Sequence, residues 1–133
     1  MKRFGGCVAA LMVALSTSSA FAESAAYACA SYDNTGFMLN KDKNRFERTS
    51  FHDEKFTAIE NGSRLTLRVD GREEVYKCEA PWHGKPNLLQ CVEEFYFMTF
   101  DKASLRFVRA LAYGYIAGSS DTLHIMYGDC QKF

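Results

Sequence analysis

Apolar and polar residues alternate with a period of two along most of the chain after residue 22. In the stretch "RLTLRV" (64–69), Leu65, Leu67 and Val69 alternate with Arg64, Thr66 and Arg68. This pattern is typical of a β-strand with one buried face. The run "EFYFMTF" (94–100) is rich in aromatic strand formers. The chain after residue 22 is therefore predicted to consist almost entirely of strands.

The Asp70-Gly71 step that follows the first run predicts a hairpin, because both central residues of a tight turn take positive φ. Two registers remain open from the sequence alone. A two-residue loop would pair Arg68 with Glu73, whereas a three-residue loop would pair Leu67 with Val75.

The stretch 121–128 has alternation of the same kind. Leu123, Ile125 and Tyr127 occupy one set of positions, and His124 and Met126 occupy the other. We expect the first set to face the core, which would leave His124 exposed.

The segment Ser104–Ala117 is ambiguous between strand and helix. With a period of two, one face carries Leu105, Phe107, Arg109, Leu111, Tyr113 and Tyr115. With a period near 3.6, one face carries Leu105, Val108, Ala112 and Tyr115. Part of the segment resembles "RFERTSF" (45–51), which is poor in helix formers, and the strand is therefore favoured.

Two stretches of the chain echo each other. "FMLNKDKNRFERT" (37–49) and "FMTFDKASLRFVRA" (97–110) both begin with Phe-Met and reach Arg-Phe-x-Arg. Each lies in a run that extends from one cysteine to another with the same order of features. The interpretation is a pair of duplicated meanders, 29–78 and 91–130, for which chance similarity of short strand patterns is the competing explanation.

The N-terminus has the features of a secretory signal peptide. Lys2 and Arg3 precede an apolar run, and Ala20-Phe21-Ala22 provides a cleavage site after Ala22. The run is shorter than the roughly 20 residues that span a bilayer. We expect a bacterial protein of the periplasm or the extracellular space, with a single mature β domain at 23–133.

Removal of residues 1–22 lowers the basic count from 16 to 14, because Lys2 and Arg3 are lost, against 16 acidic residues. The net charge near −2 gives no electrostatic case for binding nucleic acid or an anionic membrane surface. No second long apolar run is present. A stable membrane anchor is therefore not expected.

Four cysteines remain in the mature chain: Cys29, Cys78, Cys91 and Cys130. An even number in a small exported chain predicts two disulfides, and the wide spacing does not suit a metal site. The repeat favours the pairs Cys29–Cys78 and Cys91–Cys130. The nested alternative, Cys78–Cys91 with Cys29–Cys130, stays open.

The sequence contains no convergent catalytic set, so an enzyme is not predicted. His52, His83 and His124 lack metal-ligand spacing, and no phosphate-binding loop or cofactor motif is present. His52-Asp53-Glu54 is interpreted as a solvated loop. Glu73-Glu74 is interpreted as surface charge, because consecutive strand residues face opposite sides.

The candidate binding residues fall in two places. Trp82 and His83 lie in the connector "APWHGKPN" (80–87), whose prolines and glycine predict a loop. Tyr113 and Tyr115 follow Arg109, and such residues are enriched at interfaces. An inward Arg109 would need a buried partner, and the pattern names none.

We therefore expect an all-β, disulfide-bonded barrel or sandwich of about eight to ten short antiparallel strands. The leading hypothesis is an exported, non-enzymatic protein that binds a macromolecular partner, as an inhibitor or an accessory of the cell envelope. The alternative is a carrier of a small apolar ligand, with a barrel interior lined by Phe95, Phe97 and Leu111.

Overall fold

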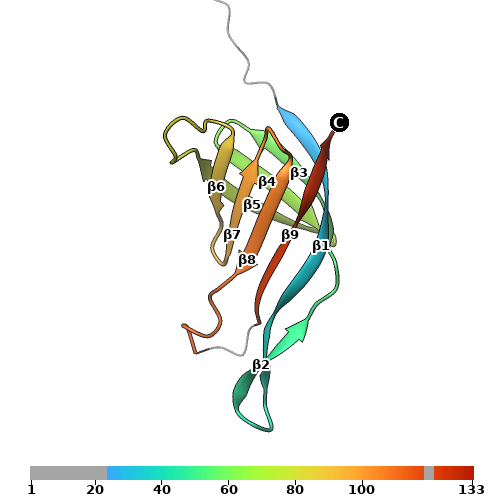
Figure 1. The fold of residues 1–133 in the computed structure, drawn as a ribbon, viewed down its shortest axis with the longest axis vertical. Coiled ribbons are helices and arrows are strands. Elements are labelled where there is room, and N and C mark those ends of the chain that lie inside the picture. Colours follow the sequence, from blue (N-terminus) through green and yellow to red (C-terminus); the bar gives the residue numbers. More distant parts are fainter. Residues whose placement is uncertain (1–23, 119–121) are drawn as a thin grey trace, which may run out of the picture.

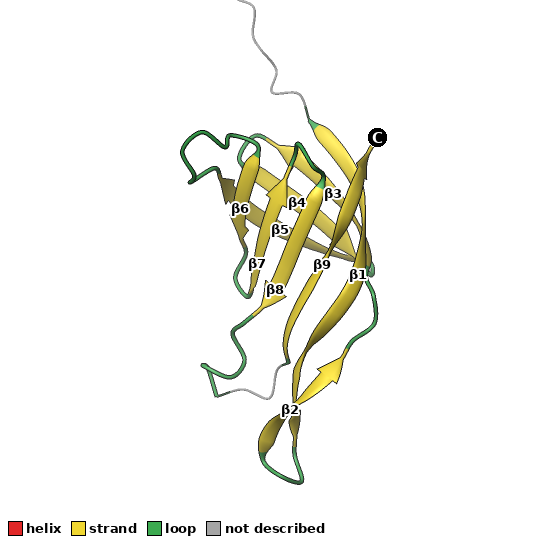
Figure 2. Cartoon of the chain, in the orientation of Figure 1, coloured by secondary structure: helices red, strands yellow, loops and turns green. Residues whose placement is uncertain are grey.

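The computed structural model describes residues 24–118 and 122–133, which form nine β-strands and, within these ranges, no helix (Figures 1 and 2). The predicted signal peptide lies outside the described residues. The strands are β1 (Ala25–Asn40), β2 (Arg45–Ser50), β3 (Lys55–Asn61), β4 (Arg64–Val69), β5 (Arg72–Glu79), β6 (Leu88–Val92), β7 (Tyr96–Asp101), β8 (Arg106–Leu111) and β9 (Leu123–Lys132). The all-β prediction is confirmed.

Eight of the strands close into an antiparallel barrel, and β2 is an additional strand outside it. Each strand from β3 to β9 pairs with the next, and β1 closes the ring by pairing with both β3 and β9. The long β1 pairs with three strands. Ala25–Ala30 pairs with β3, Thr35–Asn40 pairs with β2, and most of the strand pairs with β9 on its other side. A register shift between Ser31 and Asp33 redirects the strand between these two parts. The β1–β2 hairpin therefore projects beyond the barrel (Figure 1).

The barrel interior is filled by side chains. The predicted alternation in β4 is confirmed, because Leu65, Leu67 and Val69 are fully buried. Asp70 and Gly71 form a two-residue turn with φ of 48° and 76°, which pairs Arg68 with Glu73 and selects the shorter of the two predicted loops. Large buried side chains from the other strands complete the core: Tyr27, Phe56, Tyr76, Met98, Phe100, Phe107 and Met126.

The expected burial in β9 is wrong. Met126 is buried, whereas Ile125 and Tyr127 are exposed. Cys130 faces the interior, where it bonds to Cys29. Because side chains alternate along a strand, an inward residue 130 also turns residue 126 inward and residues 125 and 127 outward.

Two disulfides are present, as predicted, but the favoured pairing is wrong. Cys29 bonds to Cys130, and Cys78 bonds to Cys91. Each bond joins residues directly opposite one another, on β1 and β9 or on β5 and β6. The nested pattern follows from barrel closure, which places the first strand beside the last. The bonds are compatible with an oxidising extracellular compartment.

The echoed stretches form two hairpins with similar turns. Asn40 and Asp101 each accept a hydrogen bond from the backbone N–H two residues on, and each pairs with the first arginine of the motif. Asn44 and Leu105, the last residues of the turns, both have positive φ. The favoured strand for the ambiguous segment is confirmed over Arg106–Leu111, after which the chain turns at 114–118.

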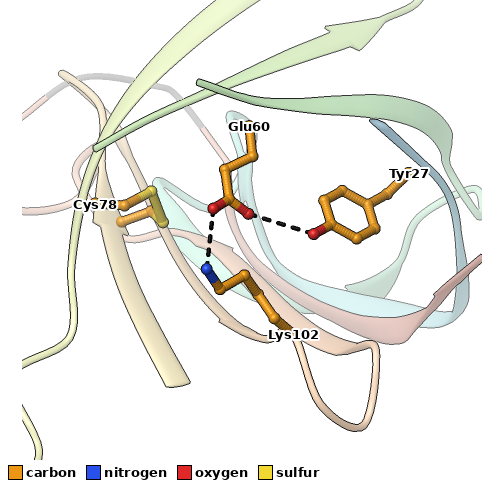
Figure 3. Close-up of a disulfide and its surroundings, with 5 residues drawn as sticks. Tyr27, Glu60, Cys78 and Lys102 are labelled. Carbon is orange, nitrogen blue, oxygen red and sulfur yellow. Dashed lines mark hydrogen bonds and ion pairs between the residues drawn. A yellow bond between two sulfur atoms is a disulfide. The ribbon is translucent and has the colours of Figure 1, made fainter. Parts of the chain in front are cut away.

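A polar cluster lies at the barrel end that carries the two termini. Glu60 accepts hydrogen bonds from Tyr27 Oη at 3.3 Å and from Lys102 Nζ at 2.9 Å, beside the disulfide of Cys78 (Figure 3). Burial, followed by the nearby Glu60 carboxylate, raises the pKa of Tyr27. These contacts join β1, β3 and the turn between β7 and β8.

Candidate functional site

The predicted binding residues do not form one surface. Trp82 and His83 lie in the exposed connector between β5 and β6, at the end of the barrel that carries the termini (Figure 1). Tyr113 and Tyr115 are exposed at the opposite end, where the β1–β2 hairpin projects. Arg109 lies in the interior and is only 1% exposed.

Among the described residues, four side chains contact the Arg109 guanidinium. Its Nη2 lies 2.9 and 2.7 Å from the two carboxylate oxygens of Glu74, and its Nη1 donates to Glu54 at 2.9 Å. Its Nε donates to the hydroxyl of Tyr76 at 3.1 Å, and its guanidinium carbon lies 3.9 Å from the ring centroid of Tyr96. This network supplies the buried partners that the sequence pattern did not name.

The Arg109 network lies where β5 and β6 are only partly paired in the barrel wall. β5 pairs with β6 over Lys77–Glu79, and no strand of the described residues pairs with Arg72–Tyr76 of β5 on that side. Arg109 comes from β8 and binds Glu74 and Tyr76 of this part. We interpret Arg109 as a clasp that joins β5 to β8 where backbone pairing is missing.

The network stabilises the charge of Arg109 more than the charge of Glu54. Burial alone would lower the pKa of Arg109, but Tyr76 and Glu74 outweigh burial and raise it. Burial raises the pKa of the Glu54 carboxyl, and attraction to Arg109 offsets only part of that effect. Burial likewise raises the pKa of Tyr76 and Tyr96, so both hydroxyls stay protonated. Glu54, which is bound through one oxygen, is the weaker carboxylate partner.

A polar pocket of about 760 Å³ opens beside this network at the hairpin end. Asn34 links two of its walls, because its Nδ2 donates to the carbonyl oxygen of His52 and its Oδ1 lies 3.0 Å from His124 Nδ1. The pocket is lined by Ser31, Asn34, Phe51, His52, Asp53, Glu54, Lys55, Asp70, Thr122 and His124. Within the described chain, the side-chain hydrogen-bond partner of His124 is the amide of Asn34. An amide does not titrate, so these two residues do not form an acid–base pair for catalysis.

His124 is expected to make stability depend on pH. Burial, followed by repulsion from Arg109, lowers its pKa below the ordinary 6.5. The folded protein thus binds fewer protons at this site than the unfolded chain, and the stabilisation is present above pH 6.5 and lost as pH falls through the lowered pKa. Urea unfolding between pH 7.5 and 5 should show this loss in the wild type and a smaller loss in His124→Gln. Equal pH dependence in both proteins would contradict the assignment.

The outer surface of β6–β9 is unexpectedly apolar. One row across four strands carries Val92, Phe97, Ala110 and Ile125, each opposite the next. A neighbouring pair is Val108 opposite Tyr127. Phe97 and Ile125 are each 51% exposed. We call Val92, Phe97, Val108, Ile125 and Tyr127 the apolar face; β6–β9 lie side by side in Figure 1.

A second exposed apolar group lies at the hairpin end. Ile116 is 84% exposed and Tyr115 is 67% exposed, and with the exposed Tyr113 of the same loop they form what we call the apolar tip. The ring of Tyr115 packs against Phe46 of β2 at 5.5 Å, and Tyr113 packs against Phe95 at 5.2 Å. An apolar groove of about 420 Å³, lined in part by Phe37, Tyr115 and Ile125, lies between the tip and the apolar face.

Several sequence-based assignments change with these positions. Glu74 and Glu54, interpreted as surface or loop charge, instead bind Arg109, whereas Glu73 faces outward near Arg68. His124 is half-buried and not exposed.

The residues proposed to line a ligand-carrying interior are also placed differently. Phe95 and Phe97 are exposed on the outside, and only Leu111 is half-buried.

Within the described ranges, no group of three or more His, Cys, Asp or Glu side chains could hold a metal ion. The described part of the chain also has no helix with the length and hydropathy needed to cross a membrane. No protein-family model, curated protein or solved structure matches this chain.

Proposed function

We propose that this protein is an exported, non-enzymatic binding protein that recognises a macromolecular partner, as an inhibitor or an accessory of the cell envelope. The apolar face of β6–β9 is the proposed recognition surface. One observation carries the proposal: the row Val92, Phe97, Ala110, Ile125 is apolar across four adjacent strands on the outside of the barrel.

The outside of an antiparallel barrel that contacts only water is expected to be polar. The outer positions of β3–β5 largely follow this rule, with Thr57, Thr66, Arg68, Glu73 and Lys77. The apolar face departs from it on the other wall. Contiguous exposed apolar surface of this kind marks interaction sites, and large aromatic side chains such as Phe97 and Tyr127 are frequent binding hot spots.

Affinity capture from envelope extracts tests the proposal. The wild-type protein should retain a defined protein partner. Phe97→Ser/Ile125→Ser should retain it about tenfold less or worse, because both changes remove apolar area from the centre of the surface. The two side chains are exposed, so the barrel should remain folded, which circular dichroism can verify.

Two control variants locate the surface. Trp82→Ala changes the connector at the termini end, and Ile116→Ser changes the apolar tip; both should capture the partner as the wild type does. Loss of capture in Trp82→Ala with full capture by Phe97→Ser/Ile125→Ser would move the binding site to the connector. An empty result for the wild type would remove support for a protein partner.

A further inference from the structure

We infer that the hairpin end of the barrel is a reversible docking site for an anionic lipid bilayer. The apolar tip would enter the interface, and the cations of the β1–β2 hairpin would lie against the headgroups. This surface adjoins the apolar face across the apolar groove but consists of other residues, so the inference goes beyond the proposed function and does not depend on it.

The charge of the chain is unevenly distributed, which the net value conceals. The hairpin segment 40–50 carries four basic residues (Lys41, Lys43, Arg45, Arg48) and two acidic residues (Asp42, Glu47), a net charge of +2. The rest of residues 23–133 then has 10 basic and 14 acidic residues, a net charge of −4. The hairpin is therefore a positively charged projection on a protein whose remaining charge is negative, and an anionic surface would attract this projection.

The hairpin cations remain available to a surface. Glu47, one of the two acids, accepts hydrogen bonds from Asn40, Lys43 and Arg45, which lower its pKa. Even so, the side chains of Lys43 and Arg45 are 56% and 66% exposed. Lys41 and Arg48 are exposed as well.

The tip next to this hairpin has the composition of a membrane interface. Residues 112–118 contain no charged side chain and include Tyr113, Tyr115 and Ile116. Tyrosine favours the headgroup region, and an exposed isoleucine gains from entering the acyl boundary. The Phe46–Tyr115 ring contact connects these residues to the hairpin. Figure 1 shows the hairpin and this loop extending beyond the turns between β4 and β5 and between β6 and β7.

The shape of this end favours a bilayer over a protein partner. The exposed isoleucine and tyrosine lie on a projecting loop beside cations, and not on a broad face such as that of β6–β9. Peripheral membrane binding is strengthened by apolar residues that enter the interface and by the attraction of nearby Lys and Arg side chains to anionic lipids.

Sedimentation with lipid vesicles tests the inference. The purified protein, with both disulfides formed, should bind vesicles that contain phosphatidylglycerol and bind phosphatidylcholine vesicles at least tenfold more weakly. Lys41→Gln/Arg48→Gln leaves the Glu47 contacts intact but removes the net charge of the hairpin. This variant should bind anionic vesicles about thirtyfold more weakly. Ile116→Ser should weaken binding about tenfold.

Matched controls separate the tip from the rest of the surface. Arg64→Gln/Lys77→Gln removes two exposed cations far from the hairpin, and Phe97→Ser/Ile125→Ser removes apolar area from the face. Both should bind anionic vesicles as the wild type does. In Trp82→Phe/Ile116→Trp, the single tryptophan sits at the tip, and its emission should shift to shorter wavelength when vesicles are added.

Absence of binding to anionic vesicles, or equal losses in the tip variants and their controls, would overturn the inference. If the protein does not bind vesicles, and Ile116→Ser abolishes capture of a protein from the extract, then the tip recognises a protein and the inference is wrong. The capture experiment with Phe97→Ser/Ile125→Ser reports separately on the proposed function, so that either conclusion can fail without the other.

Discussion

Arg109→Met is expected to lower the free energy of unfolding by about 3–5 kcal/mol. Methionine fills much of the space but leaves Glu54 and Glu74 without their cation inside the barrel wall. Whole domains are stable by only about 5–15 kcal/mol, so the loss is large. Urea unfolding followed by far-UV circular dichroism measures it. Local opening of the barrel is expected first in Arg72–Tyr76, the part of β5 that does not pair with β6.

Two companion variants keep the Arg109 prediction open to contradiction. Arg106→Met, on the same strand but outward and exposed, should change stability by no more than about 0.5 kcal/mol. Arg109→Lys retains the charge but has one nitrogen in place of the three that bind Glu74, Glu54 and Tyr76, so an intermediate loss of stability is expected. If Arg109→Met and Arg106→Met had equal free energies of unfolding, the Arg109 network would not stabilise the contact between β5 and β8.

Local features of the fold were predictable from the sequence because they depend on neighbouring residues. Leu65, Leu67 and Val69 alternate without interruption, and Asp70-Gly71 takes the positive φ values of a two-residue hairpin. In both cases one face, one turn and one neighbouring strand determine the result. The strand at 106–111 did not follow from its own pattern, which fits a helix as well, but from the resemblance of this segment to 45–51.

Features that depend on barrel closure were not predictable in this way. Glu74 and Glu54 are 35 and 55 residues from Arg109 in the chain, and no local pattern connects them. In β9 both faces carry apolar residues, so alternation alone could not decide which face is buried. The Cys29–Cys130 bond decides it, because it fixes Cys130 toward the interior.

The same ambiguity explains why the apolar face was missed. A strand with Ile125 and Tyr127 on one side and Met126 on the other supports either orientation. The simplest assumption places the larger apolar set inside, and that assumption would also remove the exposed face. Exposed apolar residues on a strand are therefore visible only once the opposite face is known to be buried.

Loss of the Cys29–Cys130 bond is expected to have an effect on stability as large as that of Arg109→Met. This bond spans 101 residues and the Cys78–Cys91 bond spans 13. Because a cross-link stabilises chiefly by restricting the unfolded chain, Cys29→Ala/Cys130→Ala should lose about 4.7 kcal/mol and Cys78→Ala/Cys91→Ala about 3 kcal/mol. Urea unfolding of each double variant against the wild type measures both values.

The position of each bond in the barrel should reinforce this order. Cys29–Cys130 joins β1 to β9, the pair that closes the ring, whereas Cys78–Cys91 joins strands already connected by a short loop. Peptide mapping of the unreduced protein should recover Cys29 linked to Cys130, and the repeat pairing would instead link Cys29 to Cys78. Under the repeat pairing each double variant would remove one cysteine from both bonds and so break both of them, which would make the two variants nearly equal in stability. A clear difference in which loss of Cys29–Cys130 costs more would therefore support closure of the barrel by its first and last strands.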